Sequence, residues 1–277
     1  MKKNKEHILK DKKNNNKKIA INNIYAIILT QIYLRRFFMG RAHEVRAASM
    51  AATAAKKTAL YNRASKEIYM AAKSGDPDPN SNLALRAAIE KYKGQNISKD
   101  VINRAIEKAK GGSAESYIEG RYEGFGQGNC YIIIDTLTDN ANRAYTNVRT
   151  AVNKKGGHLG TPGSVAFNFE QLGVITFETS KSAEELEELL IMGDVDLRSV
   201  VKDDDYAEVL VAPEALEAAK EVLNGEGISE FQKCEKSMIP NEYVTLEGED
   251  LEKFQQLLDI LDEVEDVQAV YHNVENA

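Results

Sequence analysis

Tryptophan is absent from this sequence of 277 residues, which has only two cysteines, five prolines and four histidines. Cys130 and Cys234 cannot build a disulfide framework. Each falls in a strand-like run, so both are predicted to be small buried residues in a reducing cytoplasm. The histidines, at positions 6, 43, 158 and 272, are not at metal spacing with a cysteine or with one another. A zinc site is therefore not expected.

A long hydrophobic run is also missing. The nearest candidate, Ile19 to Tyr33, is interrupted by polar residues and is too short and too polar for a membrane span. Residues 1–38 join this stretch to a Lys/Asn-rich opening, and Arg35-Arg36-Phe37-Phe38 is a poor signal-peptide cleavage site. We favour an extension outside the fold, with Met39 as the functional start, over a targeting segment, and we expect a cytoplasmic protein.

No recognisable catalytic or cofactor motif occurs. Gly124-Phe125-Gly126-Gln127-Gly128 precedes a strand instead of following one, and neither it nor Gly156–Ser164 contains Gly-Lys-Ser/Thr. Both are interpreted as flexible turns. Asp203-Asp204-Asp205 lacks the ligand spacing of a calcium loop. We therefore expect no enzymatic activity, no cofactor or metal, and no small-molecule substrate.

Charge is distributed very unevenly along the chain. Residues 1–38 contain ten basic and two acidic side chains, and residues 39–73 contain seven and two. Residues 121–277 contain 12 basic and 32 acidic side chains. Such asymmetry indicates a basic end that seeks a polyanion, attached to an acidic body.

The basic end is predicted to be helical. Residues 39–73 are rich in Ala and free of Pro, and a turn with Gly75, Pro77 and Pro79 follows them. A second helix has its apolar side at Leu85, Ala88 and Tyr92, and a third follows Ser98 and stops at Gly111-Gly112. These segments predict a small helical bundle.

After Gly112 the pattern changes to alternating strands and helices. Two outer segments each predict strand, helix and strand, at 130–134, 141–155 and 164–169, and again at 243–246, 250–261 and 267–274. The segment between them predicts six elements, at 174–177, 183–192, 197–201, 207–211, 213–223 and 228–234.

We therefore predict an α+β protein with an N-terminal helical bundle and two ferredoxin-like α/β domains, one inserted in the other. The predicted boundaries are 39–116 for the basic helical domain, 117–170 plus 239–277 for the split domain, and 171–238 for the inserted domain.

Basic side chains at helical spacing are the strongest functional signal. Lys56 and Arg63 are seven residues apart, as are Lys66 and Lys73, which places much of the charge along one side of a helix. Phosphates favour such an array through counterion release. The alternative is an ordinary solvated helix. The candidate nucleic-acid-binding residues are Arg41, Arg46, Lys56, Lys57, Arg63, Lys66 and Lys73, with Arg143, Lys154 and Lys155 as secondary candidates.

Several ordered segments resemble one known family. They are Met39-Gly40-Arg41, 73–82 (KSGDPDPNSN), 107–112 (EKAKGG), 121–126 (RYEGFG), 135–140 (DTLTDN), the Gly-rich stretch 156–164, and 270–274 (VYHNV). From Met39 to the C-terminus the chain is similar to the YebC/PmpR family, which includes a mitochondrial translational activator of cytochrome oxidase. Ala42-His43-Glu44-Val45 departs from the family's Trp/Lys-rich opening, so contacts made there cannot be transferred.

The resemblance implies a cytoplasmic three-domain protein without cofactor or enzymatic reaction. It supports two functions: a DNA-binding transcriptional regulator, which we take as the lead, and a ribosome-associated factor that contacts ribosomal RNA and relieves stalling at proline-rich stretches. A protein-interaction module is a third hypothesis, because a fold does not fix a function. Against the first, no clear helix-turn-helix or dimerisation heptad is present.

Overall fold

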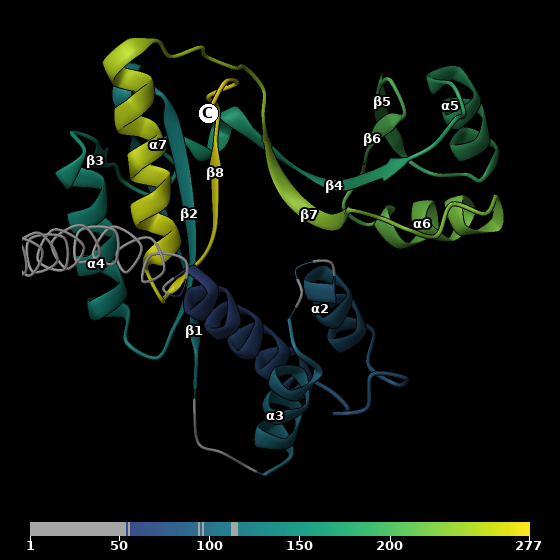
Figure 1. Cartoon of the computed structure of the whole chain (residues 1–277), viewed down its shortest axis with the longest axis horizontal. Helices are drawn as coiled ribbons and strands as arrows, with labels where there is room; N and C mark the ends of the chain where they lie inside the picture. The colour runs from purple at the N-terminus through teal and green to yellow at the C-terminus, as the bar shows by residue number, and fades with distance from the viewer. Residues whose placement is uncertain (1–53, 55, 94, 96, 112–115) are drawn as a thin grey trace, which may run out of the picture. The chain divides into compact units, whose positions relative to one another are not determined.

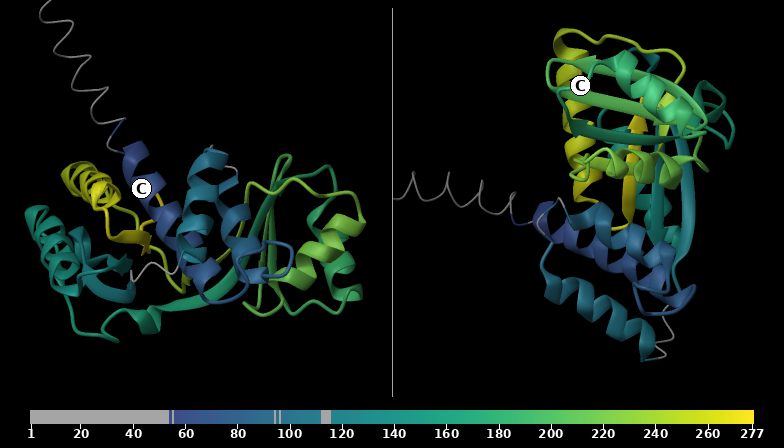
Figure 2. Two further views of the ribbon diagram at one scale, coloured as in Figure 1. Left: turned by 90° about the horizontal axis from the view of Figure 1, so that it is seen from below. Right: turned by 90° about the vertical axis from the view of Figure 1, so that its right-hand side faces the viewer.

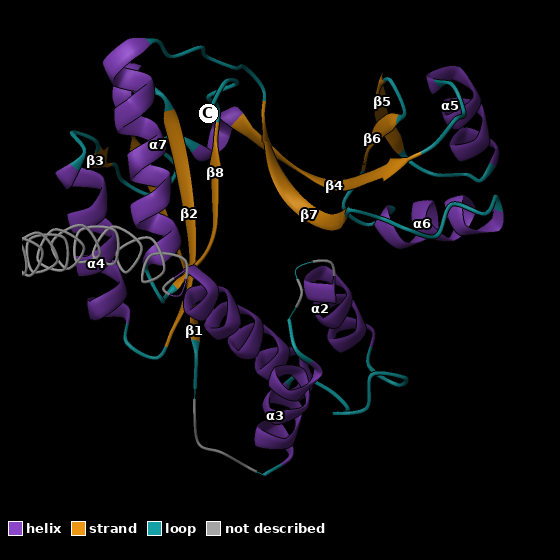
Figure 3. Cartoon of the chain, viewed as in Figure 1, coloured by secondary structure: helices purple, strands orange, loops and turns teal. Residues whose placement is uncertain are grey.

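The computed structural model of the chain describes residue 54 and residues 56–93, 95, 97–111 and 116–277 (Figure 1). The chain divides into two units, residues 1–55 and residues 56–277, and every labelled helix and strand lies in the second unit. Helices and strands are mapped in Figure 3. The predicted contact residues Arg41 and Arg46 lie outside the described residues.

Three helices form the helical domain, as the sequence predicts. They are helix 56–73, α2 (Leu83–Lys93) and α3 (Lys99–Lys110). Ala64, Ile68 and Ala72 recur every four residues along helix 56–73 and are buried, since residues at this spacing share one helix face. Asn82 starts α2 by accepting the backbone N–H of Leu85 at 3.0 Å.

The first sheet has the strand order β3-β1-β2-β8, and all of its pairings are antiparallel. Its strands are β1 (Ile118–Phe125), β2 (Tyr131–Thr138), β3 (His158–Leu159) and β8 (Val267–His272). Helices α4 (Ala141–Lys154) and α7 (Gly248–Glu263) cover one face. Figure 2 shows these two helices side by side. β2 is buried on both faces, because Ile132 and Ile134 contact the helices while Ile133 packs in a separate cluster with Val165 and Phe169.

Three details of the predicted outer domain are wrong. Residues 164–169 are not a strand: Ala166–Asn168 form a 3-10 turn, and β4 begins only at Phe169. The cause is Glu123, whose carboxylate accepts backbone N–H groups of this segment that a strand would donate to its neighbour. The predicted strand 243–246 is reduced to a single bridge between Val244 and Val274.

The third error is the omission of β1, which pairs along its whole length with β2. Its glycines, Gly120 and Gly124, give it weak strand propensity. Gly124 is not part of a flexible turn either, because an added Cβ would lie 2.8 Å from the carbonyl oxygen of His158 in β3. Gly157 is similarly constrained, because a Cβ added there would lie 2.6 Å from the carbonyl oxygen of Phe125. These glycines allow close approach of two strands.

The second sheet has the order β5-β6-β4-β7, also antiparallel throughout. Its elements follow the ferredoxin-like series βαββαβ. They are β4 (Phe169–Glu178), α5 (Ala183–Met192), β5 (Leu197–Asp203), β6 (Tyr206–Val211), α6 (Leu216–Gly225) and β7 (Lys233–Pro240). Leu186, Leu190 and Leu223 of the helices pack on one face of this sheet. All of these elements lie between β3 and β8 of the first sheet along the chain.

Candidate nucleic-acid interface

Four predicted contact residues lie in the first eleven residues of helix 56–73, namely Lys56, Lys57, Arg63 and Lys66. Three of them, Lys56, Arg63 and Lys66, contact the α7–β8 region. Lys56 forms an exposed ion pair with Asp259 of α7, with Nζ 2.7 Å from Oδ1. Arg63 and Lys66 lie further along, seven and ten residues after Lys56, so all three lie on neighbouring positions of the helix surface. The predicted row of cations therefore exists, but it faces a row of acidic residues in the same chain.

Arg63 donates to three acceptors, two at the end of α7 and one at the start of β8. Its Nη1 lies 2.7 Å from Asp262 Oδ1, its Nη2 2.6 Å from the Asp262 carbonyl oxygen, and its Nε 2.7 Å from the Val267 carbonyl oxygen. Only 13% of the side chain is exposed. The planar guanidinium can bind several acceptors at once, which an ammonium group cannot.

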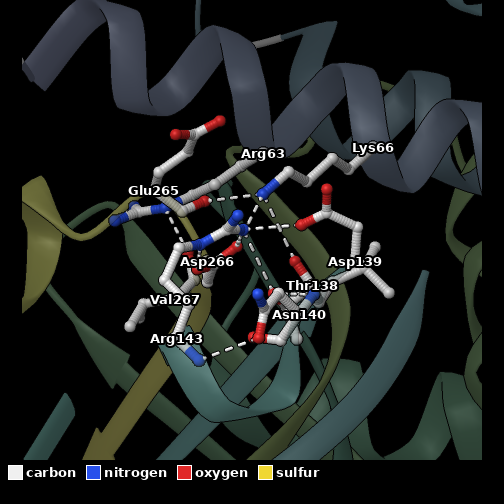
Figure 4. A network of polar contacts seen from close by, with 10 residues as sticks. Arg63, Lys66, Thr138, Asp139, Asn140, Arg143, Glu265, Asp266 and Val267 are labelled. Carbon is white, nitrogen blue, oxygen red and sulfur yellow. Dashed lines mark hydrogen bonds and ion pairs between the residues drawn. The ribbon is translucent and has the colours of Figure 1, made fainter. Parts of the chain in front are cut away.

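Lys66 enters a buried polar network, seen from close by in Figure 4. Its Nζ lies 3.2 Å from Asp266 Oδ1 and 3.1 Å from the Glu265 carbonyl oxygen. Arg143 of α4 approaches the same carboxylate, with Nη2 2.8 Å from Oδ1 and Nε 3.0 Å from Oδ2. Asp266 is 1% exposed and the Lys66 side chain 9%.

Asp266 stays charged in this network. Burial alone would raise the pKa of its carboxyl group, but hydrogen bonds from Arg143 and Lys66 oppose it, and the pKa lies below its ordinary value. We refer to Arg63, Lys66, Arg143, Asp262 and Asp266 as the latch, because they join the helical domain to the first sheet. The sequence carried no sign of this pairing, since partners such as Lys66 and Asp266 lie 200 residues apart.

The other predicted residues remain at the surface. Lys57 is exposed, with Nζ 5.4 Å from the centroid of the Tyr61 ring. Lys73 is exposed and donates to the Tyr69 hydroxyl at 3.1 Å. Lys154 is exposed at the end of α4, while Lys155 is half-buried with Nζ 2.5 Å from Gln256 Oε1. Arg143 is 43% exposed, although its charge is paired within the latch.

Charge still separates the helical domain from the rest of the described chain. Its described residues contain 12 basic and six acidic side chains, whereas residues 116–277 contain 12 and 33. Exposed basic side chains outside the latch include Lys57, Lys93, Lys99 and Arg104. A surface of this kind attracts phosphate groups without reading bases.

Glu123 is a buried charge that the sequence did not reveal. It is 7% exposed and accepts three backbone N–H groups, from Gly163 at 2.6 Å, Val165 at 2.7 Å and Ala166 at 2.8 Å. Burial raises the pKa of this carboxyl group, but the three N–H groups outweigh it and keep the pKa below normal. Glu123 fixes the loop after β3, which is a structural role.

Neither a metal cluster nor a membrane-spanning helix is found in the described part of the chain. No group of three or more His, Cys, Asp or Glu side chains there could hold a metal ion. Asp204 lies in the β5–β6 turn with a φ of 49°, as a turn residue does. Among the same residues, no helix is both long and apolar enough to cross a membrane.

Comparisons with known proteins cover most of the chain. A family model described as the TACO1/YebC protein N-terminal domain matches residues 41–112, and one described as the TACO1/YebC second and third domain matches residues 117–274. A Mesoplasma florum protein, named a probable transcriptional regulatory protein, is 51% identical over 237 residues, 85% of this chain and 99% of its own. The crystal structure of a conserved hypothetical protein from Aquifex aeolicus matches with a TM-score of 0.68 and 33% identity, covering 79% of this chain and 90% of that one.

Proposed function

Because the chain belongs to the TACO1/YebC family, we propose that it is a non-catalytic regulator of gene expression that contacts nucleic acid through its helical domain. The observation that carries the proposal is the charge separation: the described helical domain has twice as many basic as acidic side chains, whereas residues 116–277 have 12 basic and 33 acidic side chains. The name of the Mesoplasma florum relative supports a regulatory role.

Two targets are possible for this surface. A transcriptional regulator would bind duplex DNA, and the relative's name favours that reading. A ribosome-associated translation factor would instead bind ribosomal RNA. The latch favours this second target. Reading DNA bases usually requires a helix that inserts its side chains into the major groove. The central cations of helix 56–73 instead bind α7 and the α7–β8 turn, which suits recognition of a backbone by shape.

The test is co-sedimentation of the full chain with ribosomes across a salt series, with duplex DNA binding measured in parallel. The variant Lys57→Glu, Lys93→Glu, Arg104→Glu reverses exposed charge and leaves the latch intact. We expect salt-sensitive binding that this variant abolishes. The control, Lys181→Glu with Lys236→Glu, changes basic side chains of the inserted region around the second sheet.

Each result has one meaning. Ribosome association without DNA binding identifies the translation factor, and specific DNA binding without ribosome association identifies the transcriptional regulator. Equal loss in the variant and the control would contradict a role for the helical domain. Absence of any binding by the unmodified chain would refute the proposal.

A further inference from the structure

An acid-free segment lies within the most acidic part of the chain. Residues 140–169 contain no Asp or Glu, although residues 116–277 together contain 33. The same segment contains four basic residues: Arg143, Arg149, Lys154 and Lys155. A solvated helix in an acidic domain would normally carry both signs of charge. The segment therefore forms a local exception to the acidic character of its domain.

Helix α4 provides most of the exposed surface of this segment. Its buried side, Ala144, Val148, Ala151 and Val152, packs toward the first sheet and α7. Exposed positions over its last two and a half turns are Thr146, Asn147, Arg149, Thr150, Asn153 and Lys154. Arg, Lys, Thr and Asn are side chains that commonly contact phosphate oxygens.

Two of the charges on this surface are available to a ligand. Arg143 is engaged by Asp139 and Asp266. For Arg149 and Lys154, by contrast, no carboxylate partner is found among the described residues. These two residues are five positions apart, about 7.5 Å along the helix axis and about 140° around it, so they lie on the two sides of the exposed surface of α4. Tyr145, which is 44% exposed, lies four residues before Arg149 and adds an aromatic ring next to the charge.

We propose that the exposed side of α4, flanked by Arg149 and Lys154, is a second nucleic-acid contact that binds a phosphodiester backbone. The inference rests on the proposed function and extends it to the acidic part of the chain. Charge supports it: residues 140–169 contribute no carboxylate, so α4 itself repels a polyanion less than α7, whose first turn carries Glu249 and Asp250. The exposed Asn147 and Asn153 amides provide neutral donors for phosphate oxygens, whereas the Thr146 and Thr150 hydroxyls already donate to backbone carbonyl groups of α4.

The experiment measures fluorescence anisotropy of a labelled structured RNA and a labelled DNA duplex with the full chain, from low to high salt. Arg149→Ala with Lys154→Ala should make the slope of log affinity against log salt shallower by about 1.5, since each phosphate contact contributes roughly 0.7 to 0.9. Affinity near 0.1 M salt should fall by about tenfold. The matched control is Lys181→Ala with Lys236→Ala, which removes the same charge from the second-sheet domain.

The outcomes separate this inference from the proposed function. A change confined to RNA or to DNA supports the site and identifies its ligand. Unchanged slope and affinity in the α4 variant, with binding by the unmodified chain, overturn the site and leave the proposed function standing. An equal change in the control overturns the site as well, because net charge would then explain the effect. Failure of the unmodified chain to bind either nucleic acid overturns both.

Discussion

Helix 56–73 and helix α4 both carry basic side chains, yet they use them in opposite ways. On helix 56–73, Arg63 and Lys66 are buried against carboxylates and carbonyl groups of the α7–β8 region. On α4, Arg149 and Lys154 are exposed and have no carboxylate partner among the described residues. The stronger charge pattern in the sequence thus belongs partly to an intramolecular contact, and the weaker one to an accessible surface. The difference shows that charge density predicts affinity for anions but not which anion is bound.

The largest effect on stability is expected at Asp266, the buried carboxylate that binds Lys66 of helix 56–73. Asp266→Asn leaves Lys66 buried without its carboxylate, and removal of one partner from a buried ion pair costs about 3–5 kcal/mol. We expect the free energy of unfolding in urea to fall by about that amount. Asp259→Asn, which breaks only the exposed pair with Lys56, should have a much smaller effect. Equal effects of the two substitutions would show that the latch does not stabilise the fold.

Arg63→Lys should have the second-largest effect. Lysine retains the charge, but its single ammonium group cannot reach Asp262 and the Val267 carbonyl group together in the guanidinium geometry. The expected loss of unfolding free energy is about 2 kcal/mol, the scale of hydrogen bonds that involve a charged group. Arg104→Lys, at an exposed position of α3, is the matched control. A similar loss in both variants would argue against specific recognition at Arg63.

Much of the fold followed from local sequence patterns. The three helices, α4 to α7 and the strands β4, β5 and β6 were predicted because apolar residues recur at helical or strand spacing. The last strand of the second sheet was misplaced: it was predicted at 228–234, whereas β7 is Lys233–Pro240. Membership of the family, inferred from ordered motifs, is confirmed. β1 was missed because Gly120 and Gly124 hide a strand that depends on its neighbours, β2 and β3. The buried side of helix 56–73 was missed because its carboxylate partners lie about 200 residues away.

Lowering the pH tests the latch directly, because acid protonates the Asp266 carboxylate and leaves Lys66 and Arg143 charged. The pKa of Asp266 is lower in the folded protein than its unfolded value of about 3.9. Its stabilisation is therefore complete above pH ~4 and is lost as the pH falls through the lower, folded pKa. The difference in unfolding free energy between the unmodified protein and Asp266→Asn should be constant at neutral pH and shrink below pH ~4. A pH-independent difference would contradict a charged Asp266.

The smallest effect on stability is expected at α4. This effect distinguishes the cations of α4, which are expected to bind nucleic acid, from those of helix 56–73, which are expected to stabilise the fold. Arg149 and Lys154 are exposed and lie outside the core, so replacing both with Ala should change the unfolding free energy by no more than about 0.5 kcal/mol. The same double variant should still weaken nucleic-acid binding, whereas Arg63→Lys should act mainly on stability. A loss of stability in the α4 variant comparable to that in Arg63→Lys would show that Arg149 and Lys154 also stabilise the fold. The two helices would then differ in exposure alone and not in role.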